Sequence, residues 1–174
     1  MVLSGLGAVR GDRARVCVIN KGIWRMKRVL VVAGALLLSV GAVMAQQDIV
    51  KKDQDVMKAT GRALGGVLSP MFKGEKPYDQ AAVDGAIKTL EDTAKNLPTM
   101  FPASTKGLKA DGDYSASPKI WDDKAGFDAK IADFAKAVSD AKAKIKDADT
   151  LKANFPGIGK ACGGCHETYR VKNS

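Results

Sequence analysis

Apolar residues recur at steps of three and four along most of the chain, and this spacing restricts the fold more than any other feature of the sequence. In residues 47–72 the pattern is carried by Ile49, Val50, Val56, Met57, Ala63, Leu64, Val67, Leu68 and Met71. An α-helix has about 3.6 residues per turn, so these side chains share one face of a long amphipathic helix. The alternating pattern of a half-buried strand is almost absent.

Two further helices are predicted between residues 79 and 146. Asp79 precedes the second helix as its N-cap, and Pro98 ends it. The apolar face of this helix consists of Val83, Ala86, Ile87, Leu90, Ala94 and Leu97. The third helix opens with Ser117 and Pro118, a capping residue and a first-turn proline. Its apolar positions are Phe127, Ile131, Phe134, Val138 and Ile145.

The fourth helical segment, residues 150–172, is predicted to be interrupted, because Pro156 and Gly157 would break a helix begun at Leu151. We therefore expect a short helical turn and then a main helix that starts near Pro156. Residues 98–117 form the longest irregular stretch, and functional or mobile loops often have that length. Links at the other two junctions are short, so the four segments predict an all-α fold, an antiparallel four-helix bundle.

Residues 26–45 have the three parts of a secretory signal peptide: the basic pair Lys27 and Arg28, an uncharged apolar stretch, and small residues at the end. A membrane anchor is the alternative, but polar residues follow sooner than a spanning helix of about 20 apolar residues allows. Residues 1–25 resemble neither a fold nor a leader and are interpreted as an upstream-start extension. We expect cleavage after Ala45, export to a bacterial periplasm without a permanent membrane anchor, and a mature domain of residues 46–174.

The basic charge of the chain lies mostly in this leader. The full chain has 28 Lys and Arg against 19 Asp and Glu, a net charge of +9, but residues 1–45 hold seven of those basic residues and one of the acidic ones. Residues 46–174 therefore carry 21 basic and 18 acidic residues, a net charge of +3. Without a basic excess or interleaved aromatic residues, we expect no nucleic-acid partner.

Two cysteines, Cys162 and Cys165, remain after removal of the leader, and His166 follows them directly. An exported protein meets oxidising conditions, so such a pair forms a disulfide, a metal site or a covalent cofactor site. The order Cys-Gly-Gly-Cys-His is the attachment motif of c-type haem. On a helix these side chains project over one side, where two thiols add to the two vinyl groups of one porphyrin edge and the imidazole binds iron.

Other interpretations of the motif are a zinc site, a redox dithiol and a plain disulfide. A structural zinc site needs about four ligands, whereas residues 46–174 contain one histidine and no third cysteine. A thioredoxin-like dithiol usually opens a helix in a fold that contains strands. A disulfide leaves the adjacent histidine unexplained. The motif therefore predicts one covalently attached haem c per chain.

With this motif near its C-terminus, the mature chain resembles the class II c-type cytochromes, the cytochrome c′ family. The likeness is carried by residues 54–58, Leu97-Pro98 with Phe101-Pro102, Ile120-Trp121, and residues 159–170 around the motif. The resemblance implies an up-down-up-down bundle with haem between the helices, His166 as proximal iron ligand and Met57 on the distal side. Family members often have arginine four residues before the Met57 position, where this chain has Asp53.

Two more residues are candidate haem contacts. Arg170 follows His166 by four residues and is a candidate partner of a haem propionate, with a solvated helix end as the alternative. Trp121 is a candidate wall of the haem pocket, with an ordinary core residue as the alternative. The same two interpretations hold for Phe127, and its place in the apolar stripe favours the core.

The sequence shows no base, nucleophile or second metal cluster, which favours electron transfer over enzymatic turnover. With Met57 on the iron, we expect a low-spin, six-coordinate carrier of the cytochrome c-556 type. It would exchange electrons with redox partner proteins in the periplasm, as a monomer or a homodimer. With an open distal position, the alternative is a five-coordinate cytochrome c′ that binds the small diatomic gases NO or CO.

Overall fold

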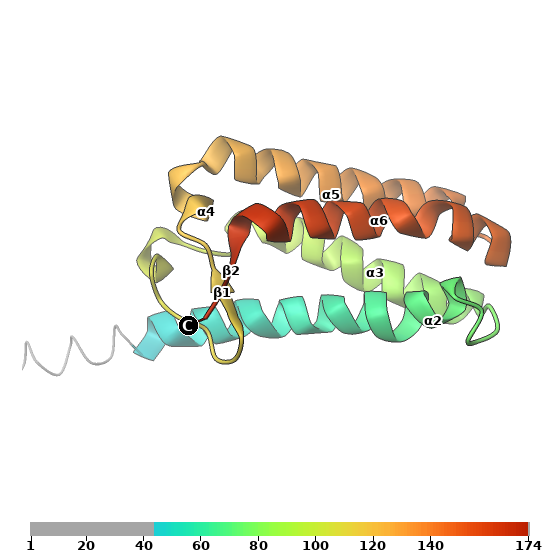
Figure 1. The fold of residues 1–174 in the computed structure, drawn as a ribbon, viewed down its shortest axis with the longest axis horizontal. Coiled ribbons are helices and arrows are strands. Elements are labelled where there is room, and N and C mark those ends of the chain that lie inside the picture. The colour runs from blue at the N-terminus through green and yellow to red at the C-terminus, as the bar shows by residue number, and fades with distance from the viewer. Residues whose placement is uncertain (1–43, 174) are drawn as a thin grey trace, which may run out of the picture. The chain divides into compact units, whose positions relative to one another are not determined.

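A computed structural model describes residues 44–173 of the chain (Figure 1). The predicted extension of residues 1–25 lies outside the described residues, as do all but the last two residues of the predicted signal peptide, 26–45. Within residues 44–173, no helix combines the length and the apolar composition that are needed to cross a lipid bilayer.

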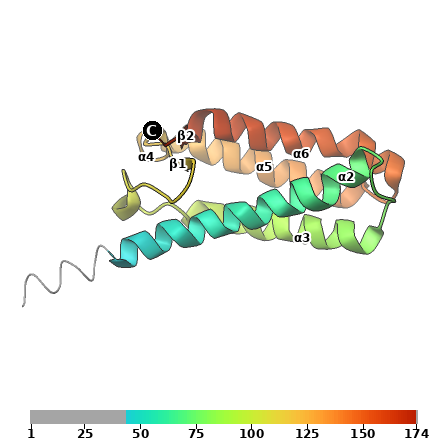
Figure 2. The same cartoon turned by 60° about the horizontal axis from the view of Figure 1, so that its bottom comes forward.

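Four long helices follow one another through the described residues. The first, here called the N-terminal helix, spans residues 44–72. The others are α3 (Gln80–Asn96), α5 (Lys124–Lys144) and α6 (Ala148–Tyr169). Successive helices run antiparallel, and α6 returns to pack against the end of the N-terminal helix (Figures 1 and 2). The predicted all-α, up-down-up-down four-helix bundle is confirmed.

The N-terminal helix matches the predicted amphipathic segment but is not α-helical throughout. Residues 44–61 are α-helical, η1 (Arg62–Leu68) is a π-helix, and α2 (Ser69–Phe72) completes the segment. A π-helix holds more residues per turn than an α-helix, so it shifts the face on which later residues lie. The segment that carries Met57 is therefore out of α-helical register with the segment that carries Met71.

Each of the three later helices begins at an aspartate whose carboxylate accepts a backbone N–H of the first turn. Asp79 caps α3, as predicted, with an Oδ1–N distance of 3.1 Å to Ala82. Asp123 caps α5 and Asp147 caps α6 in the same way. The prediction of one continuous third helix from Ser117 is wrong, because the four-residue helix α4 (Lys119–Asp122) ends before the Asp123 cap.

The predicted interruption of the fourth helix is also wrong: α6 continues through Pro156. A proline removes one backbone hydrogen bond, but here the helix is fixed on both sides of it. Asp147 and Thr150 form a capping box at its start, and Leu151 and Ile158, both fully buried, pack into the core before and after the proline. Burial of these two side chains outweighs the lost hydrogen bond.

The loop between α3 and α4 contains structure that the sequence pattern did not predict. It holds two short 3-10 helices, η2 (Leu97–Thr99) and η3 (Ala103–Thr105), and the strand β1 (Tyr114–Ala116). β1 pairs antiparallel with β2 (Arg170–Lys172) at the end of the chain, with Ser115 opposite Val171. This ladder fastens the loop to the residues that follow the cysteine motif.

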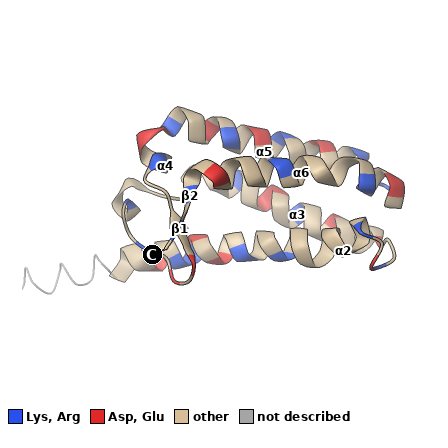
Figure 3. Ribbon diagram, viewed as in Figure 1, with Lys and Arg blue, Asp and Glu red and all other residues tan. Residues whose placement is uncertain are grey.

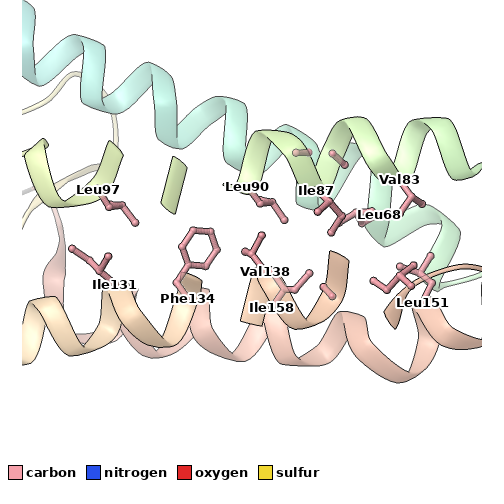
Figure 4. Close-up of a cluster of buried hydrophobic side chains, with 14 of the residues drawn as sticks. Leu68, Val83, Ile87, Leu90, Leu97, Ile131, Phe134, Val138, Leu151 and Ile158 are labelled. Atoms are coloured by element: carbon pink, nitrogen blue, oxygen red, sulfur yellow. The ribbon is translucent and has the colours of Figure 1, made fainter. Parts of the chain in front are cut away.

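The apolar core extends to Leu97, Ile120 and Phe127 toward the far end of the bundle, but its fully buried aliphatic side chains gather nearer the turn between α2 and α3. Its largest fully buried side chains, drawn in part in Figure 4, are Leu68, Val83, Leu90, Val138, Ile145, Leu151 and Ile158. On the outer faces of the helices, Lys and Arg alternate with Asp and Glu, several as ion pairs four residues apart (Figure 3). Such exposed pairs contribute little to stability, so the packed core holds this part of the bundle together.

Candidate haem-binding site

A cavity of about 720 Å³ lies in the part of the bundle that is farther from the turn between α2 and α3. Its walls come from the N-terminal helix, the loop 98–117, the β ladder and the end of α6. Ligand pockets commonly enclose about 300–1,000 Å³ and are mostly apolar with a few polar groups, and this cavity fits that description. A smaller cavity of about 50 Å³ adjoins the same residues.

The cysteine motif lies on α6 at these two cavities. Cys162, Cys165 and His166 all line the smaller cavity, and Cys165 and His166 also line the larger one. All three side chains are partly buried, and both cysteines are free thiols. The residues present therefore fit a covalently held haem, because two unpaired thiols and an imidazole on one helix border a cavity of ligand size.

Met57 reaches the same place from the N-terminal helix. Its side chain is partly buried, packs against the core and lines both cavities. Met57 and His166 thus belong to different helices but share the walls of both cavities. The two other methionines of the predicted mature chain, Met71 and Met100, line neither cavity.

The surroundings of the motif favour uncharged side chains. Burial raises the pKa of the Cys162 thiol, and the neighbouring Cys165 raises it further. Burial also raises the pKa of Cys165, against the opposing effect of Lys130. Burial lowers the pKa of His166, and the positive charge of Arg170 lowers it further. His166 is therefore neutral near pH 7, which is the form of imidazole that binds a metal.

The two other predicted haem contacts differ in position. Arg170 is exposed at the start of β2 and lines the larger cavity, with its guanidinium carbon 4.3 Å from the centre of the Tyr114 ring. This cation–π contact holds it against the loop. Trp121 lines neither cavity; its indole N–H donates to the carbonyl of Phe101 at 2.9 Å.

A row of aromatic residues forms one wall of the larger cavity. From the sequence, Phe127 was a candidate wall with the core favoured as the alternative, and Phe101 and Tyr169 were not assigned to the site. Phe101 packs edge-on against Phe127, and Phe127 packs against Tyr169, with ring centres 5.9 and 5.2 Å apart. The Tyr169 hydroxyl donates to Asp123 at 2.8 Å, and burial together with this hydrogen bond raises the pKa of Tyr169 to about 12. Phe101-Pro102 and Tyr169 lie in stretches that resemble the cytochrome c′ family. That resemblance was the signal by which both residues could have been assigned to the site.

The loop that closes the larger cavity is tied down at both sides. From the N-terminal helix, Gln47 donates to the Lys109 carbonyl at 2.9 Å, and Gln54 donates to the Asp111 carbonyl. From the C-terminus, the Asn173 amide donates to the Gly112 carbonyl at 2.6 Å. The cavity wall is therefore built by residues far apart in the sequence.

Comparisons with known proteins show the family to which this chain belongs. Residues 48–170 match the family described as Cytochrome C'. Cytochrome c-556 of Rhodopseudomonas palustris is 62% identical over 148 residues, which cover 84% of this chain and 99% of that protein. The NMR-validated structural model of oxidised R. palustris cytochrome c556 covers 74% of this chain and 99% of its own, with 60% identity and a TM-score of 0.65.

A further solved relative is a variant of cytochrome c prime from Alcaligenes xylosoxidans in complex with nitric oxide. It is 31% identical, covers 73% of this chain and 97% of its own, and has a TM-score of 0.63. The family match extends over most of the chain, and it includes the N-terminal helix, the loop and the cysteine motif. This chain therefore belongs to the cytochrome c′ family, the class II c-type cytochromes, and carries one covalently attached haem c.

Proposed function

We propose that this protein is an electron carrier of the bacterial periplasm and not an enzyme. In this proposal Cys162 and Cys165 attach the haem, His166 is the proximal iron ligand and Met57 is the distal ligand. The observation that carries the proposal is that Met57 and His166, on the N-terminal helix and α6, line the same two cavities.

The chain's own residues are suited to hold and insulate a redox group. When bound, the haem supplies a one-electron ferric–ferrous couple. Cys162 and Cys165 prevent loss of the cofactor outside the cytoplasm, because each forms a covalent thioether. His166 is kept neutral by burial and by Arg170, so it presents a lone pair for the iron. Phe101, Phe127 and Tyr169 exclude water along one wall of the cavity.

Met57 determines which kind of cytochrome the protein is. A thioether on the iron stabilises the reduced state and raises the potential, which suits a carrier. The same side chain blocks the position that a diatomic gas would occupy. Arg170 is exposed and lines the cavity with a positively charged side chain, which supports its role as partner of a haem propionate. Trp121 supports the wall from behind through its hydrogen bond to Phe101.

Redox partner proteins in the periplasm are the proposed partners, and the protein acts as a monomer or a homodimer. Support comes from the predicted signal peptide and from the Lys, Arg, Asp and Glu residues that are interspersed along the helices in the view of Figure 3.

A second candidate function is the binding of NO or CO at a five-coordinate iron. The observation in its favour is the nitric oxide complex of the A. xylosoxidans relative. The two functions differ at one position, because an iron that already has a thioether ligand has no free site for a gas.

Substitution of Met57 by leucine tests the proposal, since leucine has a similar volume but no sulfur. The wild-type protein should be low-spin in both oxidation states and should bind CO poorly. Met57→Leu should become high-spin, bind CO readily and lose roughly 100 mV of potential, a fraction of the range of about 0.8 V that axial ligands span.

Met71→Leu is the matched control, because Met71 is buried in α2 and lines neither cavity. It should leave the spin state and the CO affinity unchanged. A wild-type protein that is already high-spin and binds CO as readily as Met57→Leu would transfer the assignment to gas binding.

A further inference from the structure

Phe101 has an unusual backbone conformation for a bulky residue. Its φ angle is +62°, and within residues 44–173 every other residue with positive φ is a glycine. Residues with a Cβ rarely have positive φ, and they keep this conformation only when several surrounding contacts require it. Phe101 also lines the larger cavity, so this conformation determines the position of a ring in the haem site.

Three contacts from three different elements hold Phe101 in place. Its N–H donates to Asp53 Oδ2 of the N-terminal helix at 3.2 Å. Its carbonyl accepts the indole N–H of Trp121 in α4 at 2.9 Å. Its ring packs edge-on against Phe127 of α5, with an interplanar angle of 82°. Both backbone polar groups of this residue are thus bound by side chains from elsewhere in the chain.

Among the residues that contact Phe101, Asp53 is unusual because its carboxyl group is buried. Only 8% of its surface is exposed, and among residues 44–173 no lysine or arginine forms an ion pair with it. Burial raises the pKa of its carboxyl group, while the hydrogen bond from Phe101 and the charge of Lys52 oppose that rise. A buried carboxyl group without a cationic partner destabilises a fold unless it has another role.

We infer that Asp53 is a positioning residue, whose carboxylate holds the Phe101 backbone in its left-handed conformation and thereby fixes the Phe101 ring as a wall of the haem cavity. The hydrogen bond joins residues 48 positions apart, so it fastens the loop after α3 to the helix that carries Met57. Asp53 acts through the acceptor oxygen. An asparagine, which keeps an acceptor and lacks the charge, should therefore serve in its place.

The experiment compares Asp53→Asn with Asp53→Leu in the purified holoprotein at one fixed pH. Hydrogen exchange at the Phe101 amide, measured by NMR, reports the hydrogen bond itself, and circular dichroism in the Soret band reports the aromatic wall beside the haem. Asp53→Asn should keep both signals close to wild type. Asp53→Leu should accelerate exchange at Phe101 by about tenfold or more and change the Soret dichroism.

Asp55→Leu is the control, because Asp55 lies on the same helix but is exposed. It should leave both signals unchanged. If the Phe101 amide is as protected in Asp53→Leu as in wild type, the inference is overturned. It is overturned equally if Asp53→Asn loses protection as Asp53→Leu does, because the charge and not the acceptor would then be responsible.

A double-mutant cycle provides the answer if Asp53→Leu folds poorly. Glycine adopts positive φ without strain, so Phe101→Gly needs no anchor for its backbone. Asp53→Leu should therefore lower the unfolding midpoint less in the Phe101→Gly background than in wild type. An equal loss in both backgrounds would contradict the role of Asp53 as a positioning residue.

Discussion

The part of the bundle near the turn between α2 and α3 and the part around Met57 and His166 differ in how their interiors are filled. Near the turn between α2 and α3, aliphatic side chains such as Leu68, Val83 and Leu151 are fully buried and fill the space between the helices (Figure 4). Around Met57 and His166, the walls enclose about 720 Å³, and many lining side chains are only partly buried. The first part is stabilised by its own side chains, whereas the second requires an occupant.

This difference separates the sources of stability. In the packed part, each buried aliphatic side chain contributes roughly 1.5–3 kcal/mol relative to its exposed form. In the hollow part, the loop over the cavity is held by hydrogen bonds from Gln47, Gln54 and Asn173, and each contributes about 1 kcal/mol net. The hollow part should therefore depend on the haem and the packed part should not.

The largest effect is expected when both haem-attaching thiols are removed. In Cys162→Ser/Cys165→Ser, acid–organic extraction should remove all haem, and the chain should fold poorly because the cavity loses its contents. Hydrogen exchange should then be fastest in residues 44–61 and the loop 98–117, and slower in the buried residues near Leu68 and Leu151. Haem that survives extraction in this variant would rule out the attachment site.

A smaller effect on stability is expected when one leucine in each part of the bundle is truncated to alanine. Leu151→Ala should lower the free energy of unfolding by about 2–5 kcal/mol, since Leu151 is fully buried and leaves a cavity. Leu108→Ala should cost less, because Leu108 is only partly buried at a cavity wall. Denaturant titration of the holoproteins measures both. Equal losses would mean that the two parts are packed alike.

The smallest effect concerns the hydrogen bond between Tyr169 and Asp123. Folding raises the pKa of Tyr169 from 10.0 to about 12, so this contribution to stability is complete below pH 10 and is lost as the pH rises toward about 12. The same bond lowers the pKa of Asp123, so that contribution is present above the ordinary aspartate pKa and is lost as the pH falls through the lowered value.

Tyr169→Phe should therefore be less stable than wild type near neutral pH, and the difference should shrink toward both extremes. Thermal unfolding of the two holoproteins over that pH range provides the measurement. A difference that stays constant from neutral pH to about pH 12 would show that Tyr169 acts only by packing.

The sequence pattern predicted those features that depend on residues close together in the chain. The Asp79 cap and the apolar stripes that contain Val83 and Phe134 depend on neighbours within one helical turn, and the structure has them. The cysteine motif is likewise readable, because its spacing fixes which side chains share a helix face.

Features that depend on distant contacts could not be predicted in this way. α6 continues through Pro156 because Leu151 and Ile158 are buried against other helices. The β ladder pairs Ser115 with Val171, and three-residue strands have too short a pattern to recognise. Phe101 adopts positive φ with contacts from Asp53 and Trp121, neither of which is its neighbour in sequence.

Iron K-edge X-ray absorption of the purified holoprotein tests most directly whether His166 of α6 and Met57 of the N-terminal helix are both axial ligands of the iron. With His166 and Met57 on the iron, the spectrum should require a sulfur neighbour in addition to the nitrogens of the porphyrin and His166. That sulfur should disappear in Met57→Leu and remain in Met71→Leu. An iron without a sulfur neighbour in the wild-type protein would contradict the account.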